Sequence, residues 1–429
     1  MLINRVMNKK IKSISARHIL DSRANPTIEV EIITDDNTLG RAAVPSGAST
    51  GALEAHELRD NDSSFNGKGV NKAIENVKTT ISKSLVGIDV TDQNEIDKTL
   101  IELDGTDNKN NLGANAILAV SMASMRASAN LQSKQLFELF PNIYGQPSLP
   151  VPFMNILNGG AHADNSVDIQ EFMIVPFGFE TFDNSLKAGV EIYHTLKKRL
   201  KTNKLSTNVG DEGGFAPNFS SSKEILDEIM QSISEAGYDP GVNVSLALDV
   251  ASSEFFEDSF YKIEGNQLNS IEMADYLIDL TTKYPIISIE DGLAEDDWDG
   301  WNYLTDKIGK NIQLVGDDLF VTQEKILQKG IDDKCANSIL VKVNQVGSVT
   351  ETINTMMLAK ENRYTSVISH RSGETEDTFI SHLCVGTSSG QIKTGAPARS
   401  ERTAKYNELL RIGELIGFEK FNLQNWGYG

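Results

Sequence analysis

The sequence predicts an α/β protein in which a TIM-type (β/α)8 barrel follows a smaller α+β domain. In the second part of the chain, six short apolar runs each end abruptly at a charged residue, and helical segments separate the runs. In the first part, strand patterns precede helix patterns and do not alternate with them. The length of 429 residues suits a barrel of about 250 residues plus a second, smaller domain.

The N-terminal part begins with a predicted hairpin. Residues 27–34 nearly alternate apolar and polar side chains, residues 35–37 offer a turn, and residues 38–44 read as a second strand. The basic stretch from Met1 to Leu20 lacks the continuous apolar segment of a secretory signal. We therefore expect that stretch to be a short solvated extension.

Helices follow this hairpin. One predicted helical face carries Ile74, Val77, Ile81 and Leu85, and a second, apolar helix is expected over residues 114–129. Prolines and glycines then cluster between residues 141 and 152, which indicates a domain boundary. The expected division is an N-terminal α+β capping domain over 1–140 and a catalytic barrel over 141–429.

The apolar runs of the second part fit buried parallel strands. They end at Asp249, Glu290, Asp317, Lys342, His370–Arg371 and Lys393. Because the carboxyl ends of barrel strands meet at one rim, these charges should converge. A solvated loop or a helix cap explains any single charge, but not six in succession. Carboxylates without a Cys or His ligand pattern favour Mg²⁺ over zinc. The mixture of carboxylates and basic residues suggests that the metal holds an anionic substrate beside a basic residue.

Composition excludes several functions. The net charge of −20 and the pI of about 4.8 disfavour nucleic acids and anionic membranes as partners. Cys335 and Cys384 are too few for a disulfide framework or a thiolate zinc site. No apolar run reaches the length of a membrane span. A cytoplasmic protein with no nucleic-acid or membrane partner is expected.

Three small-residue loops could approach a ligand closely. Residues 210–217, GDEGGFAP, place an acidic pair before two glycines. Residues 46–51, SGASTG, are of the kind that folds over a site as a lid and offers oxygen ligands. Residues 158–164, NGGAHAD, contain His162. Taken alone, an ordinary turn explains each loop at least as well as a function does.

Ten segments in order carry a resemblance to a known family. They are DSRANPT (21–27), VPSGASTGALEAHELRD (44–60), NGGAHADNSVDIQEFMI (158–174), GDEGGFAP (210–217), ALDVASSEF (247–255), SIEDGLAEDDWDGW (288–301), LVGDDLF (314–320), ILVKVNQ (339–345), ISHRSGETEDT (368–378) and GQIKTGAPARSERTAKYN (390–407). In these segments the chain resembles the enolase family along almost its whole length.

The resemblance implies a hydro-lyase, a phosphopyruvate hydratase of glycolysis that reversibly dehydrates 2-phospho-D-glycerate to phosphoenolpyruvate with two Mg²⁺ per active site. It implies that Asp249, Glu290 and Asp317 hold the first Mg²⁺ and that Ser49 helps to hold the second.

The resemblance also implies the roles of the remaining site residues. Lys342 would be the general base and Glu212 the general acid. Arg371 and Ser372 would bind the phosphate, and Lys393 the substrate carboxylate. The other pocket residues would be His162, Gln170, Glu171 and His370. Lys342 must be neutral to act as a base, and burial and neighbouring cations are expected to lower its pKa.

Assembly and departures from the family complete the expectations. By resemblance, Arg17 should pair with Glu401 and Glu29 with Arg411 across a twofold axis, which implies a homodimer or a higher homo-oligomer.

Ala24 stands where the family usually has Gly, so a positive φ there would strain the turn.

Two alternatives stay open at this point. The helix over residues 114–130 and the last stretch of the chain are atypical, and both leave room for a specialised enolase that acts on an altered substrate such as a phosphonate analogue. The other alternative is a binding or structural role. A C-terminal lysine would favour a role in plasminogen capture, but this chain ends in Trp426-Gly427-Tyr428-Gly429.

Overall fold

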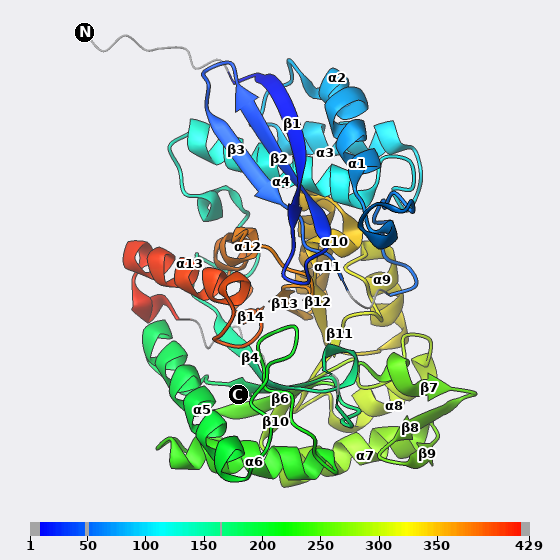
Figure 1. Ribbon diagram of the computed structural model, residues 1–429, viewed down its shortest axis with the longest axis vertical. Coiled ribbons are helices and arrows are strands. Elements are labelled where there is room, and N and C mark those ends of the chain that lie inside the picture. The colour runs from blue at the N-terminus through cyan, green and yellow to red at the C-terminus, as the bar shows by residue number, and fades with distance from the viewer. Residues whose placement is uncertain (1–8, 48–50, 164, 422–429) are drawn as a thin grey trace.

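A computed structural model describes residues 9–47, 51–163 and 165–421. Figure 1 shows two parts, a small sheet with helices at its back and, below it, a barrel surrounded by helices. The barrel is closed and has the strand order β10-β11-β12-β13-β14-β4-β5-β6. The predicted combination of a (β/α)8 barrel with a smaller α+β domain is confirmed.

The N-terminal sheet has three antiparallel strands, β1 (Ile11–Leu20), β2 (Pro26–Thr34) and β3 (Leu39–Ala43). The β2–β3 hairpin matches the prediction. The expectation of a solvated extension up to Leu20 was wrong, because residues 11–20 pair with β2 along their whole length. An irregularity in the register between Ile11 and Ser13 interrupts the alternation of apolar side chains, which hid this strand from the sequence pattern.

Helices cover one face of this sheet. The helical segments of this part are η1 (Ser64–Gly67), α1 (Asn71–Asn76), the π turn η2 (Val77–Ile81), α2 (Ser82–Leu85), α3 (Gln93–Asp104), α4 (Ala114–Leu131) and η3 (Leu136–Leu139). The four predicted apolar residues at positions 74, 77, 81 and 85 are all buried. Helix α4 lies against β3 so closely that a Cβ on Gly40 would sit 2.2 Å from the Ala123 carbonyl oxygen.

The barrel strands are β4 (Val151–Asn158), β5 (Glu171–Val175), β6 (Ser245–Asp249), β10 (Ile286–Glu290), β11 (Gln313–Gly316), β12 (Ser338–Val341), β13 (Thr365–Ser369) and β14 (Gln391–Lys393). One strand departs from the expected parallel arrangement, because β5 runs antiparallel to both β4 and β6. As a result its first residue, Glu171, lies at the rim directly beside Asp249, the last residue of β6.

The helices around the barrel are α5 (Phe182–Thr202), α6 (Ser222–Glu235), α7 (Ser270–Lys283), α8 (Trp298–Ile308), α9 (Glu324–Asp333), α10 (Val343–Val346), α11 (Val349–Glu361), α12 (Phe379–Thr387) and α13 (Ser400–Ile416). Short elements complete the chain: η4 (Gly160–His162), η5 (Ser252–Phe255), the small sheet β7 (Phe256–Glu257), β8 (Phe260–Ile263) and β9 (Asn266–Leu268), and η6 (Phe418–Lys420). Among the described residues, every helix is too short or too polar to cross a membrane.

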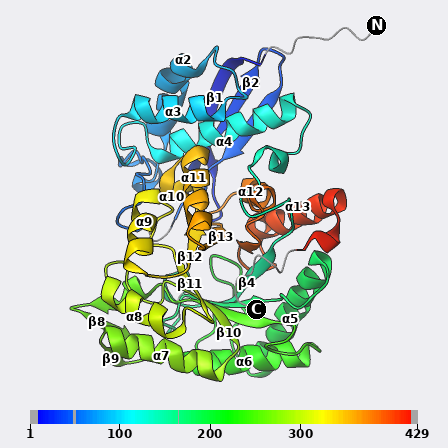
Figure 2. The same ribbon diagram turned by 180° about the vertical axis from the view of Figure 1, so that it is seen from behind.

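The N-terminal domain rests on the carboxyl-end side of the barrel. Seen from behind, α10 and α11 lie directly beneath α4 (Figure 2). The fully buried carboxylate of Asp97 on α3 accepts hydrogen bonds from the backbone N–H and the hydroxyl of Thr350 on α11. The loops of the N-terminal domain are thereby held over the rim where the charged strand ends meet.

We predict that Ala24→Gly stabilises the protein. Ala24 lies in the loop between β1 and β2 and has φ 61°, the strained value anticipated from the sequence. Glycine relieves left-handed strain of about 1–2 kcal/mol. It also raises the conformational entropy of the unfolded chain, which lowers the stability by about 0.4–1 kcal/mol. The net gain in the free energy of unfolding is about 1 kcal/mol, measurable by urea titration.

The matched control is Ala236→Gly, at a position with φ −76°. This variant relieves no strain and should lose about 0.5–1 kcal/mol. Equal effects of the two substitutions would contradict the prediction.

Candidate active site

The charged residues at the strand ends converge on one cavity. Asp249, Glu290 and Lys393 are the last residues of β6, β10 and β14, while Asp317 and Lys342 directly follow β11 and β12. The lining of the cavity includes eleven of the residues expected from the sequence: His162, Gln170, Glu171, Glu212, Asp249, Asp317, Lys342, His370, Arg371, Ser372 and Lys393. Glu290 is buried beside them, and Ser49 lies outside the described residues.

Lys393 binds the carboxylates on one side of this cavity. Its Nζ lies 2.9 Å from Asp249 Oδ2, 2.8 Å from Glu290 Oε1 and 3.3 Å from Glu171 Oε1. Burial lowers the pKa of Lys393, but these carboxylates outweigh burial and raise it well above its ordinary value. Lys393 therefore carries a full positive charge among acidic side chains.

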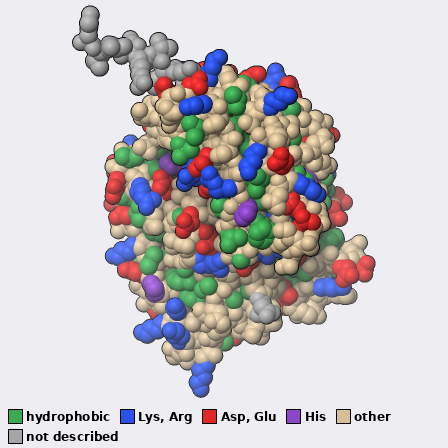
Figure 3. Space-filling model, turned by 45° about the horizontal axis from the view of Figure 1, so that its top comes forward, with side chains coloured by type: hydrophobic (Ala, Val, Ile, Leu, Met, Phe, Trp, Pro, Cys, Tyr) green, Lys and Arg blue, Asp and Glu red, His purple; other side chains and the backbone are tan. Residues whose placement is uncertain are grey.

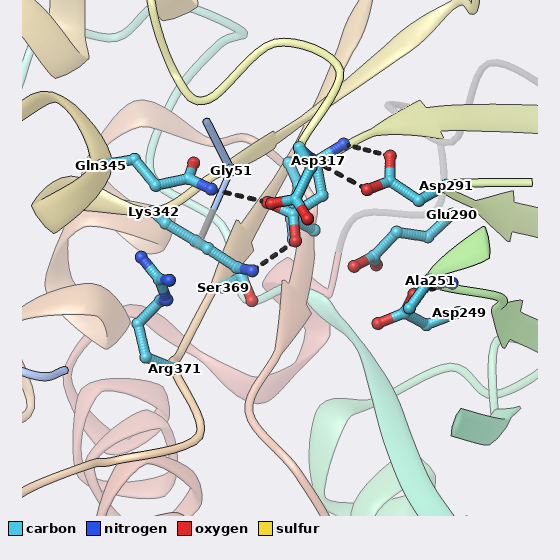
Figure 4. A network of polar contacts seen from close by, with 12 residues as sticks. Gly51, Asp249, Ala251, Glu290, Asp291, Asp317, Lys342, Gln345, Ser369 and Arg371 are labelled. Atoms are coloured by element: carbon cyan, nitrogen blue, oxygen red, sulfur yellow. Dashed lines mark hydrogen bonds and ion pairs between the residues drawn. The ribbon is translucent and has the colours of Figure 1, made fainter. Parts of the chain in front are cut away.

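Lys342 and Asp317 form a second pair on the other side. Figure 4 shows the Lys342 ammonium and the Gln345 amide both directed at the Asp317 carboxylate, with Glu290 and Asp249 facing the same space. The expectation of a lowered Lys342 pKa was wrong for this arrangement. Burial lowers the pKa, as expected, and so does the charge of Arg371, but the charges of Asp317, Asp318 and Glu290 together raise it above its ordinary value.

A third group surrounds Glu212. His162, Glu171 and Glu212 place ligand atoms within 4.8 Å of one another. Burial raises the pKa of Glu171 well above its ordinary value, and the neighbouring Glu212 adds to this effect. Because two buried carboxylates so close together cannot both ionise cheaply, one proton stays on the pair at neutral pH. Burial raises the pKa of Glu212 as well, but the neighbouring His370, His162 and Arg402 lower it well below its ordinary value, so Glu171 is the member of the pair that favours the proton.

The glycines of the 210–217 loop place Glu212 in this group. Gly213 has φ 87°, and a Cβ on Gly214 would sit 2.4 Å from Asn158 Oδ1, so the loop can run this close to β4 only with glycine. Glu212 points inward and accepts a hydrogen bond from the Asn155 amide at 3.1 Å. Asp211, the other acid of the pair, is half-exposed and binds Arg23 instead.

Arg402 was missed as a site residue by sequence reasoning. It is fully buried on α13 and donates to His370 Nδ1, to the Arg371 and Ser372 carbonyl oxygens and to the Asp211 carbonyl oxygen. Burial lowers the pKa of His370 to about 3, and the charge of Arg402 contributes. His370 is therefore neutral and accepts at Nδ1, which leaves the proton on Nε2, 3.3 Å from Glu212.

Glu54 was also missed, and it comes from the N-terminal domain. Its two carboxylate oxygens bind the Arg371 guanidinium at 3.0 Å each. Nearby, Ser46 and Gly373 exchange backbone hydrogen bonds of 2.7 and 2.8 Å. The lid candidate therefore contacts the barrel at both of its described ends, while residues 48–50 lie outside the described part of the chain. No strand-end pattern points to Glu54, because its loop belongs to the other domain.

Two family models match this chain. The one described as the enolase N-terminal domain matches residues 11–140, and the one described as the enolase C-terminal TIM barrel domain matches residues 146–424. The chain belongs to the enolase family. Membership supports an enolase-type dehydration and a lyase-type enzyme, and the enolase fold suggests that the site binds a divalent metal.

The acidic residues of this enolase site fit such an ion. Burial raises the pKa of Glu290 and of Asp291 well above their ordinary values, and adjacent carboxylates add to both shifts. Burial and the charge of Asp317 raise the pKa of Asp318 to about 7. A site in which carboxylates raise one another's pKa values is one that a divalent cation stabilises, and oxygen-only donors suit a hard cation.

The acidic trio with the closest carboxylates shares only Asp317 with the expected ligands Asp249, Glu290 and Asp317. In the described part of the chain, the acidic trio with ligand atoms within 4.8 Å of one another is Asp291, Asp317 and Asp318. The expected partners Asp249 and Glu290 are held by Lys393, while Asp317 is held by Lys342 and Gln345. Asp291 accepts the backbone N–H groups of Asp317 and Asp318 at 2.8 and 2.9 Å, so it shapes the turn around Asp317.

Proposed function

We propose that this enolase catalyses the reversible, Mg²⁺-dependent dehydration of 2-phospho-D-glycerate to phosphoenolpyruvate, the phosphopyruvate hydratase reaction of glycolysis. The observation that carries the proposal is the convergence, in one buried cavity, of Lys342, proposed as the proton acceptor, and the Glu171–Glu212 carboxyl pair, proposed as the proton donor. Removal of a proton beside a carboxylate and loss of a hydroxyl group require both functions.

In this proposal the chain's own residues divide the work. Lys342, once it has lost its own proton, takes the proton from C2, and Glu212 receives a proton from Glu171 and delivers it to the departing C3 hydroxyl. Arg371 and Ser372 bind the phosphate, for which the planar guanidinium suits two oxygens at once. Lys393 faces the substrate carboxylate, and the remaining polar pocket residues, His162, Gln170 and His370, position the substrate and its proton donors.

Metal binding is assigned to the acidic side of the cavity. Asp249, Glu290 and Asp317 are the proposed ligands of one Mg²⁺, and Ser49 is proposed to help with a second. When bound, the ions would stabilise the doubly negative carboxylate that forms when C2 loses its proton. Glu54 must release Arg371, at least in part, if that guanidinium is to bind the phosphate.

The assay that tests the proposal follows phosphoenolpyruvate absorbance from 2-phosphoglycerate, with and without Mg²⁺. A phosphonate analogue run in parallel distinguishes the altered-substrate alternative. Turnover of 2-phosphoglycerate only when Mg²⁺ is present supports the proposal. Turnover of the phosphonate alone would replace it.

We predict that Asp317→Asn reduces both Mg²⁺ affinity and turnover by roughly 100-fold or more. Substitution of a residue that contacts a metal ligand, but not the metal, costs about 10–100-fold in metal affinity or activity. Asp317 is itself a proposed ligand, so its substitution should cost at least as much. The control is Asp306→Asn, whose side chain is 78% exposed on α8. Titration calorimetry on metal-stripped protein and the phosphoenolpyruvate assay provide the readouts. Full turnover of the wild type in excess chelator would contradict the metal requirement.

A second prediction separates the two proton transfers. Glu212→Gln keeps the shape of the side chain but cannot deliver a proton, so turnover should fall by about 10²–10⁴-fold. Exchange of the C2 hydrogen with D₂O should persist in this variant, because it needs Lys342 and not Glu212. Lys342→Ala should lose exchange and turnover together, and Lys310→Ala, at an exposed position, should lose neither.

Deuterium incorporation by NMR, read beside phosphoenolpyruvate absorbance, decides between the assignments. If Glu212→Gln abolishes exchange while Lys342→Ala retains it, the acid and the base are reversed. Normal turnover in both variants would show that the site lies elsewhere.

We also propose that the protein assembles as a homodimer or a higher homo-oligomer. A hollow of about 760 Å³, larger than the active-site cavity, is lined by charged residues of both domains, among them Glu29, Arg41, Glu401 and Glu408. On the face shown in Figure 3, basic and acidic side chains are intermixed, as a self-complementary surface requires. Within one chain Arg17 binds Glu29 and Glu31, so the proposed pairing with Glu401 needs an exchange of partners.

Sedimentation should therefore give at least twice the chain mass of 47.0 kDa at micromolar concentration. Arg17→Glu should shift the protein toward the monomer, because it places like charges against Glu401 of the second copy. Lys98→Glu, at a side chain 66% exposed on α3, should not. A single 47 kDa species for the wild type would rule the assembly out.

A further inference from the structure

The turn that follows Asp317 is strained. Val321 and Thr322 are consecutive, fully buried and β-branched, yet they have φ values of 42° and 54°. Branched side chains rarely adopt this left-handed region, and such strain persists only where the surrounding structure imposes it. Strain of this kind often accompanies a functional geometry, and the two side chains contact the 46–51 loop and the active site, respectively.

Val321 reaches the lid candidate. A Cβ placed on Gly51 would lie only 2.6 Å from Val321 Cγ1, so the turn and the C-terminal end of the 46–51 loop are in direct contact. The strained turn is therefore packed against the described C-terminal end of the 46–51 loop.

Thr322 reaches the active site through one hydroxyl group. Its Oγ1 accepts the backbone N–H of Lys342 at 3.0 Å and donates to Gln345 Oε1 at 2.7 Å. The Leu340 carbonyl oxygen is a weaker alternative acceptor at 3.3 Å. The closer contacts are to Lys342, the proposed base that directly follows β12, and to Gln345 on α10.

Hydrogen bonds at both ends of the Gln345 amide set which way it faces. With Oε1 on the Thr322 hydroxyl, Nε2 donates to Asp317 Oδ1 at 2.8 Å and lies 3.3 Å from Glu54 Oε1. The flipped amide would place its oxygen against two carboxylates and its NH₂ against the backbone-bound hydroxyl. In this buried network the hydroxyl and the two carboxylates favour the same orientation, and the hydroxyl holds the oxygen end of the amide.

We propose that Thr322 is a positioning residue for metal binding, whose hydroxyl orients the Gln345 amide and thereby fixes the Asp317 carboxylate. The inference rests on the proposed role of Asp317 as a metal ligand. Partners one contact behind a ligand orient it, and here the same hydroxyl also anchors the backbone of Lys342. The same hydroxyl oxygen thus helps to position both the proposed base, Lys342, and the proposed metal ligand, Asp317.

The backbone of the turn does not depend on this hydroxyl. The Thr322 carbonyl oxygen is held separately by the Thr355 hydroxyl at 3.0 Å. Valine has nearly the shape of threonine and the same branching. Thr322→Val therefore removes the hydroxyl, keeps the φ strain unchanged and leaves the anchor of the carbonyl in place.

The test compares three variants of the full chain. Thr322→Val removes the hydroxyl and Thr322→Ser restores it. The matched control is Thr352→Val, at a fully buried threonine of α11 whose hydroxyl donates to the Ser348 carbonyl oxygen at 2.7 Å. Mg²⁺ affinity is measured by calorimetry on metal-stripped protein, with urea unfolding of the same samples.

We expect Thr322→Val to weaken Mg²⁺ binding by about 10–100-fold. Thr322→Ser and Thr352→Val should bind like the wild type, even where Thr352→Val lowers the urea midpoint as much as Thr322→Val does. In a Gln345→Met background, Thr322→Val should cause no further loss, because the hydroxyl acts through the amide.

The outcomes that overturn the inference are distinct. Equal Mg²⁺ affinity in the wild type and Thr322→Val would overturn the inference alone. So would a full additional loss in the Gln345→Met background. No Mg²⁺ binding by the wild type would overturn the proposed metal site, and this inference with it.

Discussion

The concentration of buried negative charge at the mouth of the barrel is the constraint on which the other features depend. Asp249, Glu290 and Asp317 are each less than one-tenth exposed, and an isolated buried carboxylate is very costly. Lys393 and Lys342 offset this cost because their own strands end at the same rim. The barrel closes with its acids and its lysines already paired, and a divalent cation would compete with those lysines for the same oxygens.

The same constraint explains the contribution of the N-terminal domain. Arg371 is a further buried charge, and its bidentate partner, Glu54, belongs to the other domain. Glu54 follows the 46–51 segment, whose Ser46 exchanges backbone hydrogen bonds with Gly373, so the N-terminal domain completes the charge balance of the barrel. Arg402 reaches the same region from α13, where it donates to three backbone carbonyl oxygens and to the ring of His370. The site is the place where two domains and the last long helix meet.

Reversal of one strand adds a second carboxylate pair to this arrangement. If β5 were parallel, Val175 would face the rim and Glu171 would lie at the far end of the barrel. Because β5 runs the other way, Glu171 joins Glu212 and the pair holds a proton. A pattern of charges at the carboxyl ends of strands cannot reveal such a residue, because it stands at the start of its strand. For Glu171 the family resemblance supplied what periodicity could not.

The sequence by itself determined the fold class, the α+β domain before the barrel, and the charges that end six strands, because burial of apolar runs and short loops leave few other arrangements. The comparison with the family's usual glycine also drew attention to Ala24, where the structure has a positive φ of 61°. Only the tertiary structure decided which carboxylates pair with which lysines, and so reversed the expected shift in the Lys342 pKa. It alone revealed β1, whose pattern an irregular register conceals, and it alone brought Glu54, Arg402 and Thr322 to the site. Those residues act through contacts between segments far apart in the chain, and no local pattern records such contacts.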